Sequence, residues 1–229
     1  GSIYEGHYRN GVFHGHGRMV HKNGDYYLGD FVNGLAEGQG LFEKITGEKY
    51  EGAWENNLPN GQGEHVSENK ENYSGNFVKG KRHGEGLLST DRWYYNGEFK
   101  DGKFNGIGKY FWTDNSNRHY EGSWLDDKYH GQGTYVYENG DVYIGEYKHG
   151  KKDGFGIMKM NSKGLVFEGQ WKDGKKNGPG KIEEKKGKEM NLVVQGEWVD
   201  VTIRAGLMRI CSVNAQPRPI QLFIKKRKH

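Results

Sequence analysis

A Tyr-x-Gly-x-aromatic triplet recurs eight times along this chain at nearly constant spacing. The triplets are Tyr4-Gly6-Tyr8, Tyr27-Gly29-Phe31, Tyr50-Gly52-Trp54, Tyr73-Gly75-Phe77, Tyr95-Gly97-Phe99, Tyr120-Gly122-Trp124, Tyr143-Gly145-Tyr147 and, with phenylalanine first, Phe167-Gly169-Trp171. Their first residues are 22 to 25 positions apart. A period that regular predicts stacked copies of one supersecondary unit rather than a chain that closes around a central core.

A Gly-x-Gly pair follows nine residues after the glycine of each triplet. The pairs are Gly15-Gly17, Gly38-Gly40, Gly61-Gly63, Gly84-Gly86, Gly106-Gly108, Gly131-Gly133, Gly154-Gly156 and Gly178-Gly180. Between triplet and pair, most copies carry a further glycine, and Asn57 or Asp127 replaces it in two of them. Because these residue types tolerate a positive φ, each copy is expected to contain a tight reversal there.

The alternation of residue types within each copy predicts a β-hairpin. Across residues 120–124 the two aromatic residues and the glycine occupy alternate positions, while Glu121 and Ser123 occupy the others. The second strand keeps this alternation over residues 131–137, so one face is aromatic and the other polar. Glycine normally weakens a strand, and its regular placement predicts that a ring of the neighbouring repeat lies across the backbone there.

The pattern Tyr-Glu-Gly-x-Trp-x-x-Gly-x-x-x-Gly-x-Gly over residues 4–17 and 167–180 resembles the MORN repeat (membrane occupation and recognition nexus). The resemblance covers about residues 3–187. It implies an all-β fold, an elongated single twisted antiparallel sheet of tandem hairpins with a concave aromatic groove and a convex polar back. It further implies a scaffold, since family members bind partner peptides along the groove, contact acidic phospholipids or accompany a catalytic domain. No counterpart of such catalytic machinery is recognisable here.

Composition agrees with an open repeat array. Glycine accounts for 38 of 229 residues, the mean hydropathy is −1.01, and aromatic residues at 14% must provide much of the buried surface. No apolar run near 18 residues and no signal peptide is present, so neither a membrane span nor export is expected. The single Cys211 excludes an internal disulfide and fits a reducing, cytoplasmic compartment.

The chain divides into three parts. Residues 1–2, a Gly-Ser pair, are interpreted as the remnant of tag removal, and residues 3–190 as eight MORN-type repeats. Residues 191–229 are interpreted as a degenerate ninth hairpin, begun by Val194-Gly196-Trp198, and capping strands that end in a basic tip at 225–228. A partner-binding or linker segment is the alternative for this last part.

Charge is unevenly distributed along the chain. Residues 25–75 carry a net charge of −7, whereas residues 148–189 carry +6 and residues 191–229 carry +5. Lysines in the hairpin connections are expected to form one basic edge: Lys148, Lys151, Lys152, Lys172, Lys175 and Lys176. These lysines either keep the chain soluble or contact an acidic partner or anionic lipid; nucleic acid is not expected.

Alignment of the repeat copies argues against a catalytic role for the histidines. His14, His83 and His130 each precede a Gly-x-Gly pair, where other copies carry Glu, Asn or Asp. Such a position is expected to bond the turn backbone. No Gly-Lys-Ser/Thr follows a glycine pair and no nucleophile-base arrangement is visible, so the sequence predicts no enzyme, no metal site and no cofactor.

The variable positions of the second strands are the candidate binding surface. The predicted groove residues are Phe42, Tyr110, Trp112, Tyr135, Tyr137, Met158 and Met160. Rigid rings and adaptable methionines are typical of protein-recognition surfaces, but packing between repeats would explain the same residues.

The hypothesis is a non-enzymatic scaffold that holds an extended or helical segment of a partner protein in this groove, within a cytoskeletal or membrane-associated assembly. The alternatives are an anionic-phospholipid module that uses the basic edge, and an accessory region of a larger enzyme.

Overall fold

A computed structural model describes residues 1–114, 116–187, 189–199 and 202–203 of the chain. Cys211, the basic tip at 225–228 and the capping strands expected beyond residue 203 lie outside the described residues.

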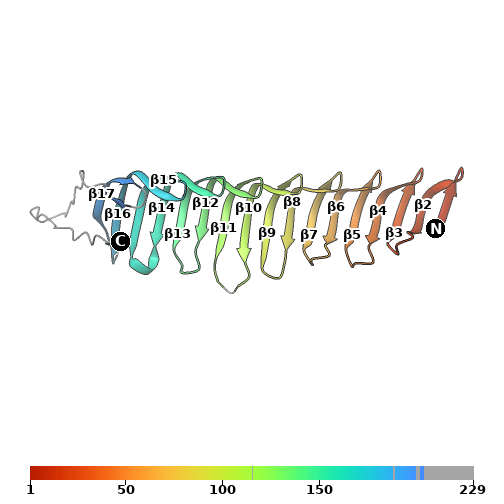
Figure 1. Cartoon of the computed structure of the whole chain (residues 1–229), viewed down its shortest axis with the longest axis horizontal. Coiled ribbons are helices and arrows are strands. Elements are labelled where there is room, and N and C mark those ends of the chain that lie inside the picture. The colour runs from red at the N-terminus through yellow and green to blue at the C-terminus, as the bar shows by residue number, and fades with distance from the viewer. Residues whose placement is uncertain (115, 188, 200–201, 204–229) are drawn as a thin grey trace, which may run out of the picture.

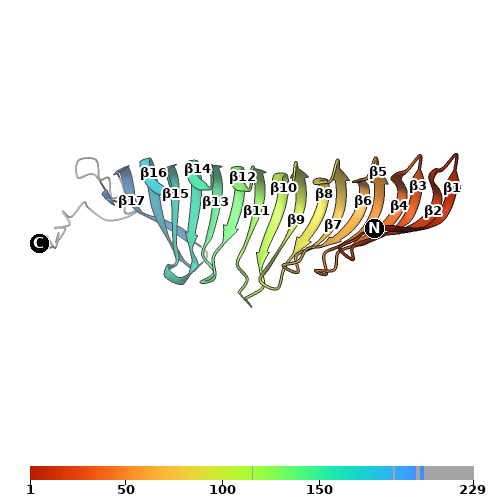
Figure 2. The ribbon, with the colours of Figure 1, turned by 45° about the vertical axis from the view of Figure 1, so that its right-hand side comes forward.

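In the described part of the chain, eighteen β-strands form one open antiparallel sheet in which each strand pairs with the next (Figure 1). The strands are β1 (Ile3–Arg9), β2 (Val12–Val20), β3 (Tyr26–Val32), β4 (Leu35–Glu43), β5 (Lys49–Glu55), β6 (Leu58–Val66), β7 (Asn72–Val78), β8 (Lys81–Ser89), β9 (Trp93–Lys100), β10 (Lys103–Trp112), β11 (His119–Leu125), β12 (Lys128–Val136), β13 (Val142–Lys148), β14 (Lys151–Met160), β15 (Leu165–Lys172), β16 (Lys175–Lys186), β17 (Glu189–Val199) and β18 (Thr202–Ile203). A short 3-10 helix, η1 (Asn161–Lys163), joins β14 to β15. The predicted elongated array of tandem hairpins is confirmed, with β1 and β17 at opposite ends (Figure 2).

Tight turns lie along one long edge of the sheet and longer connections along the other (Figure 1). Each tight turn has two residues with positive φ, as in Asn10 at 51° and Gly11 at 76°, which is the type I′ geometry that matches strand twist. In the two copies without the connection glycine, Asn57 and Asp127 both adopt a φ of 63°. The predicted reversal is therefore confirmed.

Each repeat hairpin contains a β-bulge in its second strand, around the first glycine of the Gly-x-Gly pair. In the sixth repeat the pairing of β11 with β12 skips Ser123, and the Tyr120 hydroxyl donates a hydrogen bond to the Ser123 carbonyl at 2.8 Å. The same bond joins Tyr4 to His7, Tyr27 to Asp30, Tyr50 to Ala53, Tyr73 to Asn76, Tyr95 to Glu98 and Tyr143 to Glu146, at 2.8–3.1 Å. Tyrosine thus satisfies a carbonyl that the bulge removes from the ladder.

The two glycines of each Gly-x-Gly pair have different roles. Gly131 adopts a φ of 60°, whereas Gly133 pairs with Gly122 in an extended conformation. A Cβ on Gly133 would lie 2.6 Å from Tyr120 Cε2. The ring that crosses the glycines therefore belongs to the same repeat, and the expectation of a neighbour's ring was wrong, because residues two apart on a strand share a face and the Tyr120 ring lies along its own hairpin.

An edge-to-face ladder of rings forms the core. Tyr120 meets Trp124 of its own repeat at 5.1 Å and Tyr147 of the next repeat at 5.4 Å, both nearly perpendicular. Contacts of both kinds recur from Tyr4 to the last pair, Phe167 and Trp198, whose centroids are 5.3 Å apart. Trp198 is buried on β17, so the ladder extends one step past the eighth triplet.

Candidate functional site

One position in each repeat, two residues after the tight turn, places its side chain on the ring face. We call these slot residues: Phe13, Ala36, Pro59, Arg82, Phe104, Tyr129, Lys152 and Lys176. An aromatic slot residue stacks on the first ring of its own repeat, as Phe104 does on Tyr95 at 3.8 Å. A cationic one lies over that ring, as Arg82 lies 5.2 Å from the centre of Tyr73.

A hollow of about 790 Å³ opens on the ring face of the first four repeats. The two small slot residues, Ala36 and Pro59, line it, and so do the larger Phe13 and Arg82. Further lining comes from Met19, Phe42, Trp54 and Phe77 and, among polar residues, from His21, Glu48, His65 and Lys81. Short slot side chains in two consecutive repeats therefore coincide with a cavity large enough for a few side chains of a ligand.

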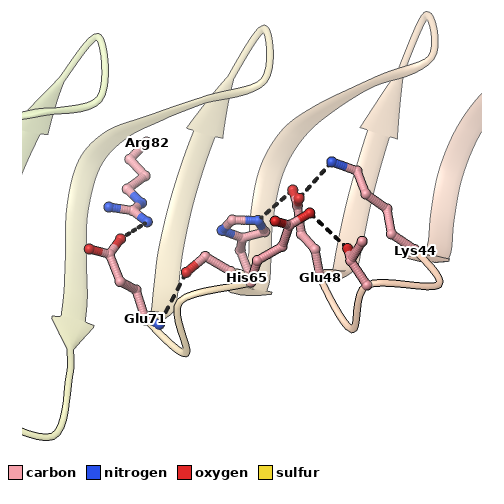
Figure 3. Close-up of polar contacts among 8 residues, drawn as sticks. Lys44, Glu48, His65, Glu71 and Arg82 are labelled. Carbon is pink, nitrogen blue, oxygen red and sulfur yellow. Dashed lines mark hydrogen bonds and ion pairs between the residues drawn. The ribbon is translucent and has the colours of Figure 1, made fainter.

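Three of the lining residues, Glu48, His65 and Arg82, take part in ion pairs (Figure 3). Lys44 Nζ donates to Glu48 Oε2 at 2.6 Å, and His65 Nε2 lies 3.2 Å from Glu48 Oε1. The Lys44 ammonium, together with His65, holds the pKa of Glu48 below its ordinary value, so this carboxylate is ionised. One repeat further on, Arg82 Nη2 donates to Glu71 Oε2 at 3.2 Å.

The MORN repeat model matches residues 4–26, 27–49, 50–70, 73–90, 95–117, 120–142, 143–163 and 167–183. These eight matches follow the hairpins of the structure one by one. This chain belongs to the MORN repeat family. MORN repeats are generally associated with scaffolds that bind proteins or membrane lipids.

The structure places the predicted groove residues of these MORN repeats in two settings. Phe42 alone lines the hollow. Five others, Tyr110, Tyr135, Tyr137, Met158 and Met160, pack partly buried against the ring core, and Trp112 packs on Tyr110 and Tyr135. Phe104 fills the slot beside Tyr110 and Tyr129 fills the slot beside Tyr135, whereas the small Ala36 leaves space beside Phe42.

The four aromatic residues among them pack against one another. Trp112 lies 4.7 Å from Tyr110 and 5.7 Å from Tyr135, which in turn lies 4.6 Å from Tyr137. Burial raises the pKa of Tyr110 and of Tyr137 to about 12. Arg118, which sequence reasoning missed, closes the cluster with its guanidinium 4.4 Å from the Trp112 ring.

The six lysines expected on one basic edge also separate. Lys148, Lys151, Lys172 and Lys175 are exposed beside tight turns, with Lys151 paired to Asp173 at 3.2 Å and Lys172 to Asp153 at 3.0 Å. The remaining two, Lys152 and Lys176, do not lie on that edge. They are slot residues, because strand alternation directs the second residue after the turn to the ring face.

Lys152 lies among three rings, with Nζ 4.7 Å from the centres of Tyr143 and Trp171 and 5.2 Å from Tyr137. Within the residues that the structure describes, no carboxylate pairs with it. Burial, with a smaller contribution from Lys176, lowers the pKa of Lys152 to about 8.

This depressed pKa predicts a pH-dependent stability. Between pH 8 and about 10.4, the ordinary lysine pKa, the unfolded chain binds more protons at this site than the folded chain, so stability should rise with pH. With partial solvent screening, we expect the wild type to gain about 1 kcal/mol more than Lys152→Met between pH 7.5 and 9.5, measured by urea unfolding. The exposed Lys151→Met is the control and should follow the wild type; identical slopes for wild type and Lys152→Met would contradict the burial.

The residues that precede the glycine pairs differ in whether they bond a turn backbone. At the equivalent position Glu37 accepts a hydrogen bond from the Asn56 amide at 3.1 Å, and Asn60 accepts one from the Lys79 amide at 3.1 Å, as expected. The Nδ1 atoms of His14 and His130 are buried and receive no such bond, so the expectation was wrong for these two.

No group of three or more His, Cys, Asp or Glu side chains in the described ranges is arranged to hold a metal ion. No helix there is long and apolar enough to cross a bilayer.

Sequence reasoning overlooked the slot residues. These residues could have been recognised from the sequence, because each lies nine positions after the first residue of its triplet. At that position the residue type varies between aromatic, small and cationic.

Proposed function

We propose that this chain is a non-enzymatic scaffold that binds a segment of a partner protein in the hollow over its first four repeats. The preformed hollow itself carries the proposal, because it is apolar on its floor, rimmed by charged side chains and of the volume that ligand sites occupy. An extended or helical segment could place a few side chains there.

The setting that we propose is a cytoskeletal or membrane-associated assembly, in keeping with the binding role of the family. The rings from Tyr110 to Tyr137 support partner binding less well than the hollow does, because they cover one another.

The lipid alternative receives less support from the arrangement of the lysines. Two of the four exposed lysines, Lys151 and Lys172, already have carboxylate partners, and two others of the expected edge turn inward. Contact with anionic vesicles is therefore a competing outcome of the test below.

Peptides selected from a randomised display library on the intact chain are the probe. Phe42→Ala should weaken their binding by about 2 kcal/mol, roughly 30-fold in Kd by titration calorimetry, because truncation removes a hydrophobic wall of the site. The matched control is Ile182→Ala, which truncates the same position in the eighth repeat, where it packs against the core outside the hollow.

Two results would contradict this function. One is peptide binding that Phe42→Ala and Ile182→Ala affect equally. The other is binding to phosphatidylserine vesicles alone, lost at high salt and in a Lys148→Glu, Lys151→Glu double variant, which would favour the lipid alternative.

A further inference from the structure

The third and fourth repeats share one residue pattern, and equivalent positions are 23 residues apart. Glu48 corresponds to Glu71, since each comes two residues before the first ring of its repeat, and Tyr50 corresponds to Tyr73. The two repeats differ at the slot residue, which is Pro59 in the third repeat and Arg82 in the fourth.

In the fourth repeat the chain itself fills the slot with a cation. The Arg82 guanidinium donates to Glu71 Oε2 at 3.2 Å (Figure 3). It also lies 5.2 Å from the centre of the Tyr73 ring. Its side chain is 18% exposed. One guanidinium thus meets a ring face and a carboxylate together, a combination that its planar shape permits.

In the third repeat the ring and the carboxylate are present, but the slot residue supplies no cation. Pro59, Tyr50 and Glu48 all line the hollow. Glu48 is ionised, and among the described residues each of its oxygens has one hydrogen-bonded partner, Lys44 or His65, so it can accept further bonds.

We propose that the partner segment inserts an arginine side chain above Pro59, where it meets Glu48 and the rings of the third repeat as Arg82 meets Glu71 and Tyr73. This inference rests on the proposed function, and it names the chemistry of the occupant: a segment of another protein that carries an arginine.

Two further observations favour a cation over a ring in this slot. Among the slot residues, cations also lie over rings in repeats seven and eight, where Lys152 Nζ is 4.7 Å from Tyr143 and Lys176 Nζ is 4.2 Å from Phe167. Residues 25–75, which include this repeat, carry a net charge of −7, so a cationic segment is attracted to this part of the array. An aromatic occupant would satisfy neither the ionised Glu48 nor this charge.

The first test uses the peptides selected on the intact chain. They should share an arginine, and replacing it with citrulline, which keeps the shape and removes the charge, should weaken binding to the wild type at least about tenfold, the loss expected for a charge-assisted pair. On Glu48→Gln that loss should largely disappear. The control Glu68→Gln removes a loop carboxylate that does not line the hollow and should leave the tenfold loss intact.

The second test fills the slot of the third repeat with an arginine of the chain itself. Pro59→Arg reproduces the residue of the fourth repeat and should lower the affinity for arginine-containing peptides more than tenfold, whereas Pro59→Ala, which leaves the slot empty, should stay within about threefold of the wild type. Thermal unfolding shows whether both variants fold; should Pro59→Arg fail to fold, the Glu48→Gln comparison decides.

The outcomes separate this inference from the function on which it rests. Peptides whose binding is weakened by Phe42→Ala but that contain no arginine, or whose arginine can be replaced by citrulline without loss, would contradict the proposed arginine. They would leave the proposed binding function of the hollow intact. An absence of any peptide sensitive to Phe42→Ala would overturn both.

Discussion

Replacing Tyr120 with alanine should lower the free energy of unfolding by about 4 kcal/mol, the range for deleting a large buried ring. Tyr120 is fully buried, touches rings of its own repeat and of the next, and stacks on Tyr129 at 3.9 Å. Its removal would open a cavity and interrupt the ladder between two repeats. Urea unfolding followed by tryptophan fluorescence measures the effect.

The matched variant Tyr120→Phe keeps the ring and removes only the hydrogen bond to the Ser123 carbonyl. It should cost about 1 kcal/mol, and Phe167 shows that the eighth repeat forms its hairpin without this hydroxyl. If Tyr120→Ala cost no more than Tyr120→Phe, the ring ladder would not be what holds neighbouring repeats together.

The Gly133→Val variant should lose about 3 kcal/mol, because its side chain would have to enter the space that the Tyr120 ring occupies. The glycine itself is buried and paired with Gly122 on one side and Gly145 on the other, so neither strand can move away easily. The midpoint of urea unfolding should fall while the slope stays unchanged.

Two variants on the same strand test whether Gly133 is special. Gln132→Val places the same side chain one residue earlier, on the exposed opposite face, and should change stability by less than about 0.5 kcal/mol. His130→Ala should cost less than about 1 kcal/mol, since the buried Nδ1 has no hydrogen-bond partner to lose. Equal losses for Gly133→Val and Gln132→Val would mean that the ring does not require the glycine.

Local chemistry made the hairpins predictable from the sequence. The two-residue alternation, the triplet spacing and the turn residues act within about 20 positions of one another. Asn57 and Asp127 could be recognised as turn residues because only a few residue types tolerate a positive φ.

The exposure of residues on the ring face was less predictable, because it depends on which side chain fills the adjacent slot. Phe42 lines a hollow because Ala36 and Pro59 are small, whereas Tyr110 and Tyr135 are covered because Phe104 and Tyr129 are large. The sequence predicts a groove mainly at Tyr110, Tyr135 and their neighbours, because aromatic residues are frequent there.

The sequence by itself therefore determined the period, the strands, the turns and the repeat family, since each follows from preferences that act within one hairpin. Only the tertiary structure decided whose ring crosses the glycines, which rings remain open to a partner and which lysines turn inward, as Lys152 does. Those properties arise where neighbouring hairpins pack together, and packing depends on the combined volumes of side chains that lie far apart in sequence.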